Sequence, residues 1–165
     1  MSHLRTEAPA NSSVATSGIS ARATTLAIFY ARVALGAAFL SAVASRFGIW
    51  RHDPSLKHFA NFLQRIAELN FFMPASTIPF LAWSATIIET ILGIALIVSG
   101  FLSFRPIGRA EWTRWIAWGS AALLALFGTE MTISAGIKSP LDFSVFSASA
   151  CALLLAVYPV THQRS

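Results

Sequence analysis

The sequence predicts an all-α membrane protein that folds as a bundle of four transmembrane helices. Of its 165 residues, 55% are hydrophobic and only 12% are charged, whereas soluble domains carry about 25% charged residues. The mean hydropathy is +0.63. The charges are clustered, so they leave four long stretches of almost wholly apolar or small residues. A helix needs about 20 such residues to cross about 30 Å of hydrocarbon, and each stretch is long enough.

These stretches and the segments between them give the expected order of elements. A segment rich in Ser, Ala and Thr, 1–23, lacks hydrophobic periodicity and is expected to be a disordered N-terminal tail. A four-helix transmembrane domain is expected over 24–160, followed by a short C-terminal tail at 161–165. The four spans are predicted, in chain order, at 24–46, 78–104, 111–135 and 140–160.

The segment between the first two spans, 53–69, is predicted to form an amphipathic interfacial helix. Asp53 and Pro54 suit a helix start, with Asp at the N-cap and Pro at the first helical position. Apolar residues then recur at spacings of three and four, and polar residues fill the other side. Beside a membrane, such a helix either lies in the interface or caps one end of the bundle.

Charge and composition indicate lipid as the main partner. The formal net charge is +5, but the basic residues flank apolar spans and form no patch with interleaved aromatics. Anionic lipid headgroups are therefore expected partners, and nucleic acid is not. Lys and Arg number six on the side of the two termini and five on the other side, so the positive-inside rule favours cytoplasmic termini by one charge. No metal site is expected, because the histidines and the single cysteine, Cys151, lack metal-ligand spacing.

Three charges inside the predicted spans, Arg32, Glu89 and Glu130, are the main candidates for a ligand-binding site. A charge at the centre of an isolated span costs about 3 kcal/mol, so it persists when it is paired, faces a cavity or takes part in chemistry. Depths counted along the helices predict an ion pair between Arg32 and Glu89, with Glu130 level with Glu89. Each member of the Arg32–Glu89 pair is followed four residues later by a glycine, Gly36 or Gly93, which would let a neighbouring backbone come close.

Two further charges, Lys138 and Asp142, are weaker ligand-binding candidates near the opposite interface. The segment from Ser139 to Asp142 has the form of a capping box, with Ser139 at the N-cap and Pro140 at the first helical position. Capping therefore already explains Asp142. No phosphate-binding loop or nucleophile motif is present, and no residue is assigned a catalytic role.

Several segments resemble the DoxX family of four-helix integral membrane proteins. They are Arg32-Val-Ala-Leu-Gly-Ala-Ala-Phe-Leu, Arg46-Phe-Gly-Ile-Trp, Leu81-Ala-Trp-Ser-Ala-Thr-Ile-Ile-Glu-Thr-Ile-Leu-Gly, and the junction from Gly136 to Ser149. The resemblance covers 26–157 and implies a four-helix bundle in a bacterial inner membrane. It also implies association with redox systems, because relatives include a subunit of a thiosulfate:quinone oxidoreductase. The cysteine pairs of the related vitamin K epoxide reductase bundle are missing from this sequence.

Three functions are consistent with these residues. The leading hypothesis is an accessory membrane subunit of a quinone-linked redox system, with redox-protein partners and a quinone or small acidic ligand held near the buried charges. The second is a small transporter of a solute or coupled to protons, in which the same charges line a polar path. The third is a non-catalytic membrane scaffold, in which the charges set only the packing of the helices.

Overall fold

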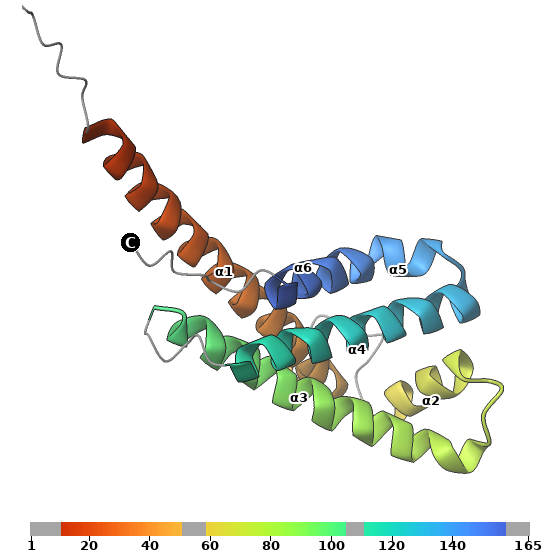
Figure 1. Ribbon diagram of the computed structural model, residues 1–165. Coiled ribbons are helices and arrows are strands. Elements are labelled where there is room, and N and C mark those ends of the chain that lie inside the picture. The colour runs from red at the N-terminus through yellow and green to blue at the C-terminus, as the bar shows by residue number, and fades with distance from the viewer. Residues whose placement is uncertain (1–10, 51–58, 105–110, 158–165) are drawn as a thin grey trace, which may run out of the picture.

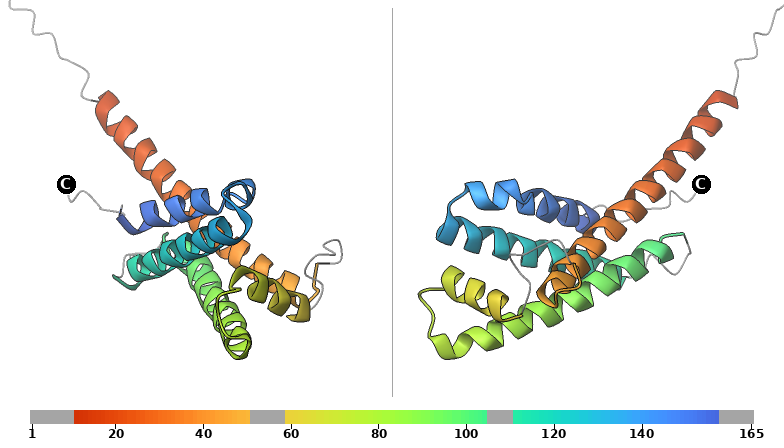
Figure 2. Two further views of the ribbon diagram at one scale, coloured as in Figure 1. Left: turned by 90° about the vertical axis from the view of Figure 1, so that its right-hand side faces the viewer. Right: turned by 180° about the vertical axis from the view of Figure 1, so that it is seen from behind.

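The structure, a computed structural model, describes residues 11–50, 59–104 and 111–157. The described part is built from helices and short connections, without strands. In chain order the elements are α1 (Asn11–Arg46), α2 (Phe59–Leu69), the 3-10 turn η1 (Ala75–Thr77), α3 (Ile78–Leu102), α4 (Glu111–Ala135), α5 (Lys138–Asp142) and α6 (Val145–Val157). Helix α1 packs along α3, and α4 packs along α6 (Figures 1 and 2). The all-α prediction is confirmed for these residues.

Three segments are long and apolar enough to cross a membrane: Arg22–Arg46, Ala75–Leu102 and Glu111–Ala135. The predicted fourth span is not one continuous helix in the structure. Residues 138–157 form two helices, α5 and α6, with a break at Phe143 and Ser144, where Ser144 has a φ of 55°. Helix α6 has 13 residues and is therefore about 20 Å long, while 158–160 lie outside the described residues.

The first helix begins earlier than the sequence predicts. Helix α1 starts at Asn11, so the prediction of a disordered tail is wrong for 11–23, whereas 1–10 lie outside the described residues. Once a helix has formed, each further residue adds one hydrogen bond at little entropic cost. The span therefore extends into the Ser- and Ala-rich segment, and this end of α1 projects beyond the other helices (Figure 2).

Helices α1 and α3 are antiparallel and approach closely at two glycines. A Cβ atom added to Gly36 would lie 2.7 Å from the carbonyl oxygen of Gly93 and 2.7 Å from the side chain of Ile97. A Cβ atom added to Gly93 would lie 3.1 Å from the carbonyl oxygen of Gly36. The expectation that these glycines permit a close backbone approach is therefore confirmed, and they fix the register of the two helices.

The core lies where the long helices meet α6. It consists of buried apolar residues from α1, α3, α4 and α6, many of them alanines: Leu35, Phe39, Leu96, Ala117, Ala121, Ala152, Leu155 and Ala156. Small residues allow helices to approach closely in a membrane, where van der Waals contact replaces the hydrophobic effect as the driving force. Ser149 adds a hydrogen bond from its hydroxyl to the carbonyl oxygen of Ala121, at 3.0 Å, which ties α6 to α4.

Helix α2 folds back along the first turns of α3 (Figure 1). Its buried residues Phe62 and Ile66 pack with Ile78 and Ala82 of α3, and it also contacts α1 and α4. The polar residues of α2 stay exposed on the other side, so the amphipathic prediction is confirmed for 59–69, while 53–58 lie outside the described residues. The helix packs against one end of the bundle, and its placement in the membrane interface stays a prediction.

Candidate functional site

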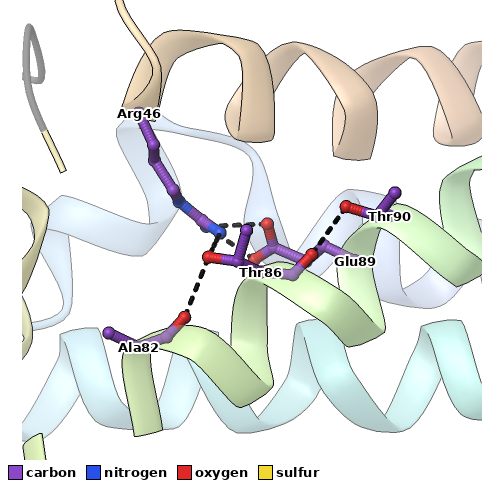
Figure 3. Close-up of polar contacts among 5 residues, drawn as sticks. All are labelled: Arg46, Ala82, Thr86, Glu89 and Thr90. Carbon is purple, nitrogen blue, oxygen red and sulfur yellow. Dashed lines mark hydrogen bonds and ion pairs between the residues drawn. The ribbon is translucent and has the colours of Figure 1, made fainter. Parts of the chain in front are cut away.

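A buried ion pair between Arg46 and Glu89 joins the end of α1 to the middle of α3 (Figure 3). The Arg46 Nη2 atom donates a hydrogen bond to Glu89 Oε1 at 2.8 Å. The Arg46 Nη1 atom donates a second one to the hydroxyl of Thr86, one turn earlier on α3, at 3.0 Å. Arg46 is 6% exposed and Glu89 is 1% exposed. Two opposite charges are thus held together in a place from which water and lipid are excluded.

Three elements hold the Arg46 side chain in position. It is the last residue of α1, where a cation interacts favourably with the helix dipole. Its guanidinium carbon lies 3.9 Å from the centroid of the Phe62 ring, which belongs to α2. The Thr86 hydroxyl that accepts from Arg46 donates in turn to the carbonyl oxygen of Ala82 at 2.8 Å. Arg46 therefore contacts α2 and α3 at once.

The second oxygen of Glu89 is incompletely satisfied. The Oε2 atom lies 2.7 Å from Arg46 Nη2, close enough for charge attraction. That nitrogen directs its hydrogen bond at Oε1, however, and no group in the described part of the chain donates a hydrogen bond to Oε2. Oε2 is therefore held by its ion-pair contact with Arg46 alone, while Oε1 also accepts a hydrogen bond.

Glu89 lines a cavity of about 450 Å³ between α1, α3, α4 and α6, which we call the Glu89 cavity. Its walls are mainly apolar and include Leu35, Phe39, Leu124 and Phe127. Sites for small molecules in proteins are typically hollows of about 300–1,000 Å³ with apolar walls and a few fixed polar groups. The Glu89 cavity has this character, with one polar end and a largely aromatic and aliphatic interior.

Two further hollows adjoin the Glu89 cavity. The Glu130 cavity, of about 190 Å³, shares Leu124, Phe127 and Val145 with it and is also lined by Arg46 and Glu130. The third hollow, the α2 groove, of about 780 Å³, is lined by Arg46 together with the polar side of α2: Asn61, Gln64, Arg65 and Glu68. Arg46 lines both of these further hollows.

Arg32 does not pair with Glu89, so that predicted ion pair is wrong. Its Nη1 atom donates to the carbonyl oxygen of Ser99 at 3.1 Å and to the hydroxyl of Ser103 at 3.2 Å, at the C-terminal end of α3. The register explains the difference. Because Gly36 faces Gly93 in an antiparallel pair, the residues four positions before each glycine are displaced in opposite directions, about 12 Å apart along the axis.

The other predicted site residues lie in different surroundings. Glu130, which is partly buried, lines the cavity named after it together with Arg46. Lys138 and Asp142 form an exposed ion pair one turn apart on α5, and neither lines any of the three hollows. The capping box is wrong, since α5 begins at Lys138 and has no side-chain cap.

Arg46 is the residue that the sequence did not reveal. It lies at the end of a predicted span and so resembles an interfacial arginine, which normally extends toward the headgroups. A signal did exist in the sequence. With Gly36 set opposite Gly93, an arginine ten residues after Gly36 lies near the level of Glu89, because its side chain extends back along the helix.

Comparison of the chain with models of protein families, with curated proteins and with solved structures found no match. The resemblance to the DoxX family therefore stays a prediction. The function is argued below from the geometry of the ion pair and the hollows around it.

Proposed function

We propose that this protein is an accessory membrane subunit of a quinone-linked redox system and that it holds a quinol in the Glu89 cavity. The observation that carries the proposal is the buried, arginine-paired carboxylate of Glu89 in the mainly apolar wall of a cavity of about 450 Å³. A quinol hydroxyl is a donor that suits this carboxylate. The apolar walls suit the ring and the first part of an isoprenoid tail.

The residues around Glu89 suit the release of a proton from such a ligand. Arg46 donates a hydrogen bond to Oε1 of Glu89, and the carboxylate is the group in the cavity wall that accepts a hydrogen bond from the ligand. Oxidation of a quinol releases two electrons and two protons. The chain has one cysteine and no dithiol to take the electrons, so we assign the oxidation to a redox protein beside this chain, which takes both electrons and the proton that Glu89 does not accept. This requirement is why we assign an accessory role.

The experiment compares the quinone content of purified variants by mass spectrometry. Wild type, Glu89→Gln and Ala38→Phe are purified in a mild detergent. The second variant fills the Glu89 cavity, which Ala38 lines, without touching the ion pair. Glu111→Gln serves as the control, because Glu111 forms its ion pair with Arg114 at the start of α4. We expect quinone in wild type and in the control, and at least a tenfold loss in the other two.

Two results would overturn the proposal. One is a wild type that carries no quinone and binds none when a quinol analogue is added. The other is an equal quinone content in wild type and Ala38→Phe, since that variant keeps every charge and fills only the cavity.

A specific observation supports each of the other two functions. The adjoining hollows join Glu89 to the polar side of α2, as a transport path would. Transport predicts flux in proteoliposomes that Glu89→Gln abolishes.

The ion pair also joins the two helices that meet at Gly36 and Gly93, as a scaffold role would require. The scaffold hypothesis predicts that Glu89→Gln changes only the stability of the protein.

We further propose that α5 and α6 together make the fourth crossing and that the protein lies in a bacterial inner membrane with cytoplasmic termini. Helix α6 contributes to the same core as the three long helices and returns along α4 (Figure 1). The excess of basic residues on the side of the termini supports the orientation.

A further inference from the structure

Glu130 differs from the other carboxylates in the described part of the chain. Glu68, Glu89, Glu111 and Asp142 each form an ion pair with an arginine or a lysine. Glu130 forms neither an ion pair nor a hydrogen bond among the described residues, although it is partly buried and lies in a candidate span. An unpaired carboxylate in such a place is costly, and it is expected to face a compensating positive charge.

The cation nearest to Glu130 is already engaged. Arg46 lines the same cavity, but its two terminal nitrogens donate to Glu89 and Thr86. Arg46 is thus already paired with Glu89, and no cation in the described part of the chain forms an ion pair with Glu130. The other buried arginine of α1, Arg32, lies 14 residues before Arg46 along the helix, or about 21 Å away.

The walls of the Glu130 cavity indicate what kind of cation fits. Apart from Arg46 and Glu130, the lining side chains are apolar: Phe62, Ile66, Leu69, Leu124, Phe127, Met131 and Val145. A hard metal ion takes six or more oxygen ligands, and the described residues contain no group of three His, Cys, Asp or Glu side chains that could hold a metal. An ammonium group is different, because aromatic faces and one carboxylate recognise it well.

The cavity is also the right size and within reach from outside. Its volume of about 190 Å³ suits a small ammonium group. It shares Arg46, Phe62, Leu69 and Met131 with the α2 groove, whose polar side chains lie on the exposed side of α2. A polar headgroup would therefore meet hydrogen-bonding groups along the groove before its ammonium reached Glu130.

We propose that the Glu130 cavity binds an ammonium group, either that of a lipid headgroup or that of a free amine, with the carboxylate of Glu130 as its counter-ion and Phe127 as part of the wall. This site is separate from the quinol position at Glu89 and goes beyond the proposed function. A negative result for ammonium binding at Glu130 therefore leaves the proposal of a quinol at Glu89 unaffected, and the reverse also holds.

The test uses choline and 3,3-dimethylbutan-1-ol, which have the same shape but differ in charge. Binding of each to the full chain in a neutral detergent is measured by equilibrium dialysis. We expect wild type to prefer choline at least tenfold over the neutral analogue. Glu130→Gln should abolish that preference, whereas the control Glu111→Gln, in which the changed carboxylate is exposed, should keep it.

A second variant keeps the test informative if Glu130→Gln fails to fold. Met131→Phe fills the same cavity and keeps Glu130, so it should also lose choline binding. The proposal is overturned if wild type does not distinguish choline from the neutral analogue. It is also overturned if Glu130→Gln and Met131→Phe both retain the preference.

Lipid nanodiscs then distinguish the two sources of the ammonium group. Wild type and Glu130→Gln are placed in nanodiscs of phosphatidylcholine and phosphatidylglycerol, and the retained lipids are counted by native mass spectrometry. Enrichment of phosphatidylcholine on wild type alone identifies a lipid headgroup as the ligand. Choline binding without that enrichment identifies a free amine. Either result supports the ammonium site.

Discussion

At the scale of single residues, the pair of Arg46 and Glu89 is the most consequential contact in the described part of the chain. Removing two charges from water costs several kcal/mol per ion, and mutual attraction offsets this only with good geometry. Here the distance is 2.7 Å, and Thr86 and Phe62 also contact the arginine. Breaking the pair from one side leaves an uncompensated charge in the interior.

We predict that Arg46→Met lowers the free energy of unfolding by about 3–5 kcal/mol, because it leaves the carboxylate of Glu89 buried and unpaired. The double variant Arg46→Met/Glu89→Met should recover most of that loss. Both are measured by unfolding in mixed micelles of dodecyl maltoside and dodecyl sulfate. With Glu89→Met as the second single variant, a double-variant loss equal to the sum of the two single losses would show that the two residues are not coupled.

The matched control is the pair of Arg65 and Glu68 on α2. These residues are 3.3 Å apart, and both side chains are about half exposed. Surface pairs of this kind contribute about 0–1 kcal/mol. Replacing Arg65 or Glu68 by Met should therefore leave the unfolding transition nearly unchanged.

The sequence indicated one member of the pair and missed the other, for a physical reason. Glu89 stands out because a carboxylate within a long apolar run is expensive. Arg46 does not, because arginines are common at the ends of spans. Counting depth from the span ends treats the helices as parallel rods with aligned ends. Only the glycine contact sets the true register.

At the scale of helices, the crossing of α1 and α3 depends on the absence of a side chain at Gly36. We predict that Gly36→Ala lowers the free energy of unfolding by about 1–3 kcal/mol, because the added Cβ atom would lie 2.7 Å from a backbone oxygen that cannot move away alone. The same unfolding assay in mixed micelles measures the change.

Gly119 of α4 supplies the control for this prediction. A Cβ atom added there would lie 3.6 Å from the side chain of Leu92, an ordinary contact. Alanine favours the helix by about 1 kcal/mol relative to glycine, so Gly119→Ala should be neutral or stabilising. Equal losses at Gly36 and Gly119 would contradict the role given to the α1–α3 contact.

The existence and type of the long helices were predictable from hydropathy, but their ends and the break in the last one were not. Helix α1 extends back to Asn11. Once a helix has formed, each further residue adds one hydrogen bond, and composition alone does not reveal how far this growth continues. The break between α5 and α6 falls at Phe143 and Ser144, without a glycine or proline at either position. Ser144 is exposed, and its carbonyl oxygen accepts a hydrogen bond from the N–H of Ala148 at the start of α6, a turn that hydropathy does not report.

At the scale of the whole molecule, the open question is how many times the chain crosses the membrane. Three segments have the length to do so, while α6 has 13 residues. We predict that topology reporters fused after Ile137 and after Ser165 lie on opposite sides of the membrane, because α5 and α6 return the chain along α4. Reporters on the same side would show three crossings.

The ion pair also has a consequence for biosynthesis. Arg46 and Glu89 are 43 residues apart in the chain. At about 5–20 residues per second, the ribosome makes Glu89 about 2–9 seconds after Arg46. During that interval the first helix ends in an arginine without its carboxylate, and this charge keeps the end of the helix at the membrane surface. Insertion of the next long helix brings Glu89 and allows Arg46 to enter the interior, so the closing of this pair marks the moment at which the nascent bundle becomes committed to its fold.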